Sequence, residues 1–435
     1  MIARPASSLL LLASKLGYQT RSFAEAARRL GACVIIGSDR CHQLEDPWAD
    51  GAVPLHFEEP QRAARSLVAA LESRSPEQKI VAILALGDGQ TVTAAYAARL
   101  LHLNYNSPEA VENCRSKLRQ REVLQRAHLR IPEFFSFTLW EPLDSVLRSV
   151  VFPCVVKPLR LSASQGVIRA NNASEFATAV ERIARLLASP ELQVTREGDL
   201  DRLLVERYIP GAEFALEGLL EQGRLRILAL FDKPDPLEGP YFEESIYVTP
   251  SRLPAHLQDE IFSCAAESVR ALGLTEGPLH AEFRLNEQGP WVLEVAPRPI
   301  GGLCSRVLRF GPQKIFLEEL LIRHALGLRG ADLARESDAA GVMMIPVPRS
   351  GILQNVIGSE QARAVAGVCE LRITARLHDL IAASPEGSSY LGFIFAGGAT
   401  PDFVEAALRQ AHAALRFEIT PRLPVAHPVS GHTVS

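Results

Sequence analysis

Two glutamates on either side of a short turn have the residue type and spacing of a metal site. Glu282 and Glu294 lie on two largely apolar runs, 280–285 and 291–295, separated by the turn sequence 286–289. If the turn joins the runs as a hairpin, strand alternation can place both carboxylates at one height on one face. Like charges among apolar neighbours need a cation, and Mg²⁺ takes carboxylate oxygens together with nucleotide phosphates. The hairpin therefore predicts a magnesium site, with a pair of solvated charges as the alternative.

An arginine follows this pair closely. Arg298 comes four residues after Glu294, inside the sequence Ala-Pro-Arg-Pro-Ile-Gly-Gly at 296–302. Its planar guanidinium suits bidentate hydrogen bonding to a phosphate or a carboxylate. We interpret Arg298 as a ligand-binding residue, and a surface arginine in a loop is the other interpretation.

Two lysines could supply further positive charge to a phosphate. Lys157 follows the apolar run 150–156, and the loop 162–166 contains small residues whose backbone amides can approach phosphate oxygens. Lys117 lies on a basic segment, 113–128, that we expect to form one helix. The chain lacks the P-loop pattern GxxxxGK[ST], so these residues would form a different phosphate site. Either lysine alone is more often simply solvated.

The elements that must position these residues begin with an alternating region. Apolar runs alternate with helical patterns over residues 8–101, which predicts a parallel α/β sheet. After the run 80–86, the sequence Gly87-Asp88-Gly89 is interpreted as a tight turn, because this motif alone is too weak to indicate a nucleotide site.

The middle of the chain combines strands and helices less regularly. Segment 149–206 predicts a small α+β unit, and 213–229 predicts two strands around a turn. A Pro-rich stretch, 232–254, follows. We expect it to be a loop that covers a binding site, since long irregular segments in compact domains are usually functional.

Length and composition bound the class of protein. At about 150 residues per domain, 435 residues predict two or three domains. The 46 basic and 50 acidic residues give a formal charge of −4, which makes nucleic acid an unfavourable partner. The seven cysteines show no CxxC spacing, so neither a disulfide framework nor a zinc site is indicated. We find no signal-peptide core and no membrane-spanning run, and expect a cytoplasmic protein with no membrane partner.

The order of these features resembles that of the ATP-grasp superfamily and, within it, the L-amino-acid ligases, which make dipeptides. The resemblance covers residues 8–415 and depends on an ordered set of motifs rather than on one. The matching segments are Lys117 with Arg121, Val155-Val156-Lys157-Pro158, the loop 162–166, the run 205–213, His280-Ala281-Glu282-Phe283 and Glu294-Val295-Ala296-Pro297-Arg298. Residues 350–353 and 390–396 resemble the additional C-terminal domain of these ligases.

The resemblance implies an α/β and α+β multidomain chain with the ATP-grasp fold. It implies an N-terminal parallel α/β domain at 1–112 and an ATP-grasp domain at 113–328, with a lid subdomain at about 132–210. A C-terminal ligase-like domain at 329–420 and a tail at 421–435 would follow.

Site residues can be carried over one by one. The resemblance implies that Lys117 and Lys157 contact ATP phosphates and that Ser164 and Gly166 belong to a flap over them. It implies that Glu206 and Ile209 lie in the hinge beside adenine and that Glu213 binds the ribose hydroxyls. It also implies that Glu282 and Glu294 hold Mg²⁺, with Mn²⁺ as an alternative, and that Arg298 orients an acyl phosphate. One position departs from the pattern. Many members have an asparagine metal ligand two residues after the second glutamate, where this chain has Ala296.

The implied reaction joins a small-molecule carboxylate to an amine. The carboxylate would attack the γ-phosphate of ATP, and an amine would then displace phosphate from the acyl phosphate, releasing ADP and phosphate. The sequence identifies no base for the amine. The alternatives are a biotin- or purine-type carboxylase and an ATP-binding protein without catalysis. Among assemblies, a homodimer is the commonest for such a chain.

A substrate pocket is predicted beside the arginine. Gly301 and Gly302 add no side-chain bulk there and would leave space, so Gly302→Trp should penalise bulky substrates. In the loop 241–250, Glu244 could receive an ammonium group.

Overall fold

The N-terminal domain is a parallel sheet covered by helices, as predicted. The computed structural model describes residues 8–14, 18–39, 52–72, 79–193, 198–328, 330 and 332–421, so the predicted tail lies almost wholly outside the described residues. The sheet has the order β3-β2-β1-β4, and every pairing in it is parallel. Its elements are β1 (Ser8–Leu12), α1 (Tyr18–Arg29), β2 (Cys33–Ser38), β3 (Ala52–Pro54), α2 (Pro60–Glu72), β4 (Ile80–Ala85) and α3 (Asp88–Leu101).

The basic segment forms two helices, where one was expected. Helix α4 (Pro108–Arg115) ends and α5 (Lys117–Arg126) begins at Ser116. Ser116 has an extended backbone, with φ −98° and ψ 118°, and its hydroxyl accepts a hydrogen bond from the Arg119 amide. A serine that caps a new helix in this way interrupts the preceding one. Lys117 therefore occupies the first turn of α5 instead of a helix interior.

The lid subdomain is a four-stranded antiparallel sheet with order β5-β8-β6-β7. Helix α7 packs on it through an apolar stripe that includes Phe176, Ala179 and Ile183. Asn172 caps α7, accepting a hydrogen bond from the Glu175 amide. The elements are β5 (Phe134–Thr138), α6 (Leu143–Leu147), β6 (Cys154–Pro158), β7 (Ile168–Ala170), α7 (Ala173–Leu187), α8 (Pro190–Gln193) and β8 (Arg202–Arg207).

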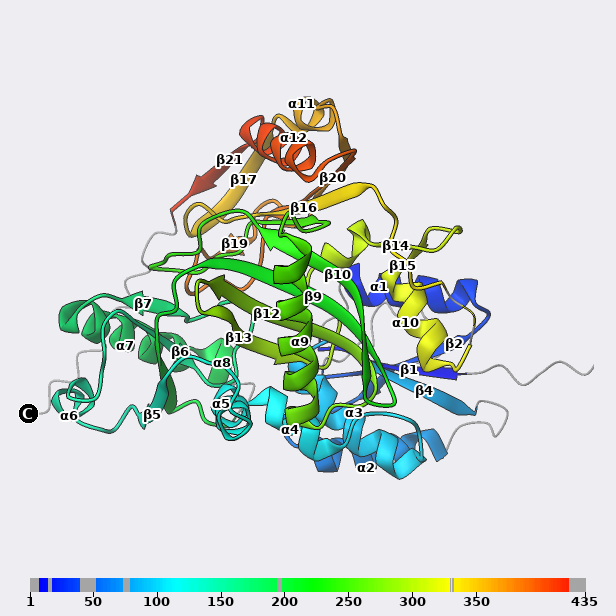
Figure 1. Cartoon of the computed structure of the whole chain (residues 1–435), viewed down its shortest axis with the longest axis horizontal. Helices are drawn as coiled ribbons and strands as arrows, with labels where there is room; N and C mark the ends of the chain where they lie inside the picture. The colour runs from blue at the N-terminus through cyan, green and yellow to red at the C-terminus, as the bar shows by residue number, and fades with distance from the viewer. Residues whose placement is uncertain are drawn as a thin grey trace, which may run out of the picture.

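A large sheet occupies the centre of the molecule (Figure 1). It has the order β13-β12-β9-β10-β11-β16-β20-β18, and α9 packs against it. The Pro-rich stretch expected to be a loop contains β11, because its Ile246 and Val248 are buried against C-terminal strands. The central part comprises β9 (Ala212–Glu221), β10 (Arg224–Lys233), β11 (Ile246–Thr249), α9 (Ala255–Leu272), β12 (Gly277–Asn286), β13 (Gly289–Ala296), the 3₁₀ helix η1 (Cys304–Val307), β14 (Arg309–Phe310), β15 (Ile315–Phe316) and α10 (Leu317–Ala325).

The C-terminal segment is joined to this sheet. Strand β16 pairs with β11, so β16, β20 and β18 continue the central sheet past the expected boundary at residue 328. A second small sheet has the order β19-β17-β21. The elements are β16 (Ala339–Ile345), β17 (Gly351–Ile357), α11 (Ser359–Arg363), β18 (Val368–Ile373), β19 (Leu380–Ile381), β20 (Gly392–Gly398), α12 (Pro401–Ala413) and β21 (Arg416–Thr420). Within the described residues, no helix has the length and apolar character needed to cross a membrane.

Candidate active site

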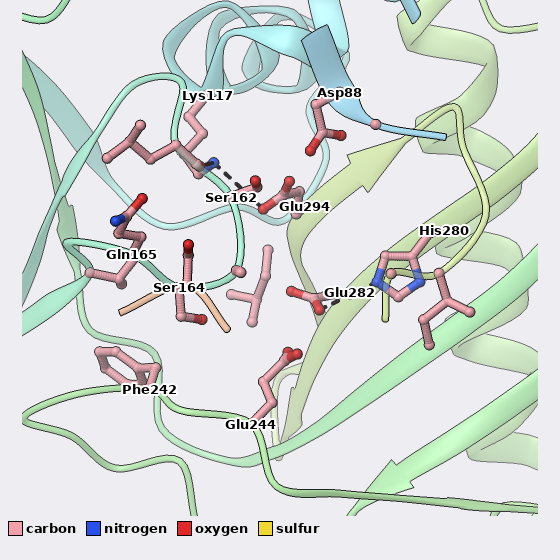
Figure 2. Close-up of a pocket in the computed structure, with 18 of the residues that line it drawn as sticks. Asp88, Lys117, Ser162, Ser164, Gln165, Phe242, Glu244, His280, Glu282 and Glu294 are labelled. Atoms are coloured by element: carbon pink, nitrogen blue, oxygen red, sulfur yellow. Dashed lines mark hydrogen bonds and ion pairs between the residues drawn. The ribbon is translucent and has the colours of Figure 1, made fainter. Parts of the chain in front are cut away.

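One cavity of about 650 Å³ lies where the N-terminal domain, the lid, the central sheet and the C-terminal segment meet (Figure 2). Every predicted site residue except Gly166 lines it. The predicted residues in its wall are Lys117, Lys157, Ser164, Glu206, Ile209, Glu213, Glu244, Glu282, Glu294, Arg298, Gly301 and Gly302.

The predicted hairpin is present with the predicted register. Strands β12 and β13 are antiparallel, and Glu282 pairs directly with Glu294. Directly opposed residues share a face of the sheet, so both carboxylates face the cavity. Their partners differ. Glu294 lies 3.7 Å from the Lys117 ammonium, whereas Glu282 contacts Lys233 and His280.

Lys233, at the end of β10, forms a charged cluster that the sequence did not reveal. Its Nζ donates to carboxylate oxygens of Glu213 at 2.8 Å, Glu244 at 2.5 Å and Glu282 at 2.9 Å, and its side chain is 2% exposed. Burial opposes its charge, but the three carboxylates hold the pKa of Lys233 well above its usual range. The ammonium thereby holds three acidic side chains together in the cavity wall.

Glu244 and Glu282, two of the carboxylates around Lys233, have pKa values shifted in opposite directions. Burial raises the pKa of Glu244 to about 7, aided by the Glu282 charge and opposed by Lys233. Burial also opposes ionisation of Glu282, yet attraction to Lys233 and the His280 hydrogen bond hold its pKa well below the usual range. Glu282 is therefore ionised at neutral pH, as a metal ligand must be.

His280 is a second buried cation beside the hairpin. Its Nδ1 lies 2.5 Å from a Glu217 oxygen, and its Nε2 lies 3.4 Å from Glu282. Burial would lower its pKa, but attraction to Glu217 outweighs burial and raises the pKa of His280 to about 9. The imidazolium is therefore protonated at neutral pH and stabilises the Glu282 carboxylate.

Lys157 belongs to a buried ionic triad that joins the lid to α5. Glu206 accepts hydrogen bonds at 2.7 Å from both Arg121 Nε and Lys157 Nζ. Burial together with repulsion from Arg121 and Lys117 lowers the pKa of Lys157, while Glu206 opposes this. The Glu206 side chain, predicted for the adenine hinge, therefore holds Lys157 in place at the cavity wall. The triad has two positive side chains and one negative one, so an anionic phosphate bound here would balance its charge.

Lys117 and the lid loop form the other side of the predicted phosphate site. Lys117 Nζ donates to the Leu161 carbonyl at 2.8 Å, next to the flap, which we define as residues 162–166. Figure 2 shows Ser162, Ser164 and Gln165 of this flap beside the cavity. Gly166 does not line the cavity, because its amide donates to the Pro385 carbonyl at 2.9 Å. In this structure its N–H is engaged by the C-terminal domain and not aimed at a phosphate.

Gly166 is required where it lies. Its φ is +71°, and a Cβ there would approach Pro158 Cγ to 3.0 Å. Both the left-handed backbone and this close approach favour glycine at the end of the flap.

The predicted hinge region is occupied by aromatic and paired side chains. Ile209 lines the cavity, and its carbonyl accepts a hydrogen bond from Arg284 at 2.7 Å. Tyr208 and Phe242 stack with ring centroids 6.5 Å apart. Both oxygens of Glu213, predicted to bind ribose, are engaged by Lys233 and Arg284. An incoming ribose would therefore compete with two buried cations for this carboxylate.

Arg298 has a partner in the N-terminal domain that sequence reasoning missed. Its Nε and Nη2 donate to the two oxygens of Asp88 at 2.6 and 3.2 Å. Burial opposes ionisation of Asp88, but Arg298 lowers its pKa to about 2. The Gly87-Asp88-Gly89 turn, interpreted from the sequence as structural, is thus part of the cavity wall.

The substrate end of the cavity is bounded by small and apolar residues. A Cβ on Gly301 would have no heavy atom within 4 Å, so there is open space at this position. Gly302 differs, since its φ is +64° and its Cβ would lie 3.1 Å from Phe393. A bulky side chain at Gly302 would strain the backbone, so Gly301 is the better position to test the predicted space. Nearby wall residues are Tyr247, Cys304, Met344 and Tyr390.

The donor set fits a hard divalent cation. Glu282 and Glu294 lie opposite each other on the hairpin and could both offer carboxylate oxygens. The oxygens of Glu213, Glu244 and Glu282 lie within 4.8 Å of one another, but Lys233 Nζ already binds all three. Oxygen-only ligands beside two lysines suit Mg²⁺ bound together with a phosphate. Ala296 is buried and supplies no third side-chain oxygen.

Two family models match the chain. The model described as the ATP-grasp domain matches residues 150–307. The model described as L-amino acid ligase C-terminal domain 2 matches residues 343–420. The second match covers the C-terminal strands that continue the central sheet.

Relatives and solved structures agree with these matches. The crystal structure of an L-amino acid ligase from Bacillus licheniformis superposes with a TM-score of 0.81 at 27% identity, covering 96% of this chain and all of that one. Carnosine synthase 1 of Gallus gallus is 28% identical over 81% of this chain, which spans 38% of that protein. Alanine–anticapsin ligase of Bacillus subtilis is 25% identical over 48% of this chain and 46% of its own length. The chain therefore carries an ATP-grasp domain and an L-amino acid ligase C-terminal domain 2, and over almost its whole length its structure is similar to that of an L-amino acid ligase.

Proposed function

We propose that this ligase joins the carboxyl group of one amino acid, or a similar carboxylate, to the amino group of another at the expense of ATP. The observation that carries the proposal is the convergence of Glu282, Glu294, Lys117, Lys157 and Arg298 on one cavity. Two anions, a carboxylate and a γ-phosphate, must approach each other in the first step. Fixed cations around the point of attack lower that repulsion.

Each side chain contributes a distinct part. Lys117 and Lys157 would hold the ATP phosphates from the two sides of the flap. Glu282 and Glu294 would hold Mg²⁺, which would neutralise phosphate charge when bound. Arg298 would exchange its Asp88 contact for the acyl phosphate, keeping a planar pair of donors on the reacting group.

The substrate end of the cavity supports an amino-acid substrate. Glu244 lies at this end beside Tyr247, and its carboxylate could accept hydrogen bonds from an α-ammonium group. Gly301 leaves room for a side chain next to Arg298. The C-terminal ligase domain completes this wall through Ser388 and Tyr390, which favours a ligase over the carboxylases of the same superfamily.

The test is a screen of amino-acid pairs with ATP and Mg²⁺, following phosphate release and detecting the product by mass. We expect pair-dependent phosphate release with one ADP per dipeptide. Release that depends on bicarbonate and needs no amine would instead identify a carboxylase. ATP binding without turnover across the whole panel would identify an ATP-binding protein without catalysis.

The proposed metal site has its own test. Arg298→Met should abolish ligation while ATP still binds, whereas Glu282→Gln should weaken Mg²⁺-dependent ATP binding, measured by calorimetry with and without Mg²⁺. Equal Mg²⁺ dependence of ATP binding in Glu282→Gln and the unchanged chain would overturn the role given to Glu282.

A further inference from the structure

A loop of the C-terminal domain is hydrogen-bonded to the flap of the lid. We call residues 382–391, between β19 and β20, the latch loop. Gln165 Nε2 donates to the Glu386 carbonyl at 2.7 Å, and the Gly166 amide donates to the Pro385 carbonyl at 2.9 Å. These two hydrogen bonds join the segment that would cover the phosphates to a part of the chain more than 200 residues away.

An ion pair strengthens this contact. Arg182 of α7 donates to both oxygens of Glu386, from Nη2 at 2.8 Å and from Nε, and its Nη1 donates to the Tyr241 hydroxyl. The side chains of Arg182 and Glu386 are 33% and 36% exposed. The Arg182 hydrogen bonds hold the pKa of Glu386 below its usual range, so the pair stays charged at neutral pH. A planar bidentate pair fixes orientation as well as distance.

The same latch loop reaches the substrate end of the cavity. Ser388 and Tyr390 line the cavity two and four residues after Glu386. Tyr390 packs on Phe393 of β20 with ring centroids 6.2 Å apart, which ties this end of the loop to the central sheet. One short segment therefore contacts both the flap over the phosphates and the wall around the substrate.

We propose that Glu386 is a positioning residue that keeps the flap closed over the acyl phosphate until the amine attacks. This inference rests on the proposed ligase function. A closed flap excludes water, which would otherwise compete with the amine. In that side reaction a water oxygen bonds to the acyl carbon, the bond from that carbon to the phosphate oxygen breaks, and the free acid, phosphate and one proton are released. ATP is then consumed without dipeptide.

The measurement that separates this role from simple stability is the ratio of dipeptide formed to ADP released. For Glu386→Gln we expect this ratio to fall about two- to fivefold, the range expected from losing one partly exposed ion pair. Glu386→Arg, which places a cation beside Arg182, should lower it further. Combining Glu386→Arg with Arg182→Glu exchanges the charges and should restore most of the ratio. The control is Glu360→Gln, which removes an exposed ion pair with Arg363 elsewhere in the C-terminal domain.

A second measurement, which does not depend on catalysis, distinguishes a change at the flap from a general loss of activity. Amide hydrogen exchange of residues 162–166 in the presence of ATP should be faster in Glu386→Arg than in the unchanged chain or in Glu360→Gln. An unchanged product ratio together with unchanged hydrogen exchange in Glu386→Arg would overturn the role proposed for Glu386. Failure of the unchanged chain to form any dipeptide would overturn the proposed function, and the exchange comparison would still judge the contact between loop and flap.

Discussion

Replacing Asp88 by asparagine tests whether the N-terminal domain holds Arg298 in place. The Asp88→Asn change keeps the shape of the side chain and removes its charge. A carboxyl whose pKa lies at about 2 in the folded chain, against an ordinary 3.8, stabilises the fold by about 2 kcal/mol at neutral pH. Both partners are largely buried, at 12% and 18% exposed, so solvent screens little of this. We expect a loss of about 2–4 kcal/mol, because the buried guanidinium also loses its bidentate partner.

Asp88 has a second favourable interaction, which must be separated from the first. It lies in the first turn of α3, where a negative charge contributes about 0.3–1 kcal/mol through the helix dipole. A double-mutant cycle with Arg298→Met cancels this contribution, since it is present with either residue at 298. The coupling free energy should be about 2 kcal/mol. It is measured as the free energy of opening of α3, from amide hydrogen exchange.

The pH dependence of the coupling gives an independent check. Because the folded pKa of Asp88 is below the unfolded one, the coupling should be fully present above pH 3.8 and be lost as the pH falls through about 2. It should therefore be equal at pH 5 and pH 7. Single changes that add to within about 0.5 kcal/mol at pH 7 would refute the reasoning, since independent sites behave that way.

Three further changes test the cavity. Glu282→Gln and Glu294→Gln should each lower turnover by about a hundredfold or more with an unchanged circular dichroism spectrum, as expected for loss of one preorganised charge; full ADP release by both would contradict the metal assignment. Gly301→Trp should reduce activity toward bulky amino acids more than toward alanine or glycine, with little change in ATP affinity. An equal loss of activity toward all substrates would contradict the predicted space beside Gly301. Gly302→Trp should instead lower the melting temperature. Glu206→Gln should destabilise the lid by about 3–5 kcal/mol, measured by urea unfolding, because it leaves two buried cations without their carboxylate; a loss under about 1 kcal/mol would show that water reaches them.

The hairpin could be predicted from the sequence because its determinants are local. Two apolar runs and a short turn fix the register of β12 and β13, and register decides which face each side chain occupies. Glu282 and Glu294 were therefore assigned to one face without any knowledge of the remaining chain. The glycine at 301 was predictable for the same reason, because the absence of a side chain needs no partner.

The partners of these residues could not be predicted in this way. Arg298 and Asp88 are 210 positions apart, and Gly-Asp-Gly after a strand usually signals only a turn. Lys233 ends a long strand and resembles a solvated terminal lysine, although the fold surrounds it with three carboxylates. Ser116 did carry a local signal. A capping serine before a basic helix predicts a helix start, and at the junction of α4 and α5 this local signal outweighs the continuous charge pattern.

The strand β11, inside the Pro-rich stretch 232–254, determines how the C-terminal segment is connected to the active site. Read as a loop, it leaves the C-terminal segment as a separate domain that could be remote from catalysis. Because β11 lies between β10 and β16, the C-terminal strands extend the sheet that carries Glu282 and Glu294. The latch loop leads directly into β20 of this sheet, so the segment that contacts the flap and the hairpin that carries the proposed metal ligands are joined through one continuous sheet. The lid has a sheet of its own, so we expect the lid to be the part that moves and its closure to carry Lys157 toward groups on the central sheet.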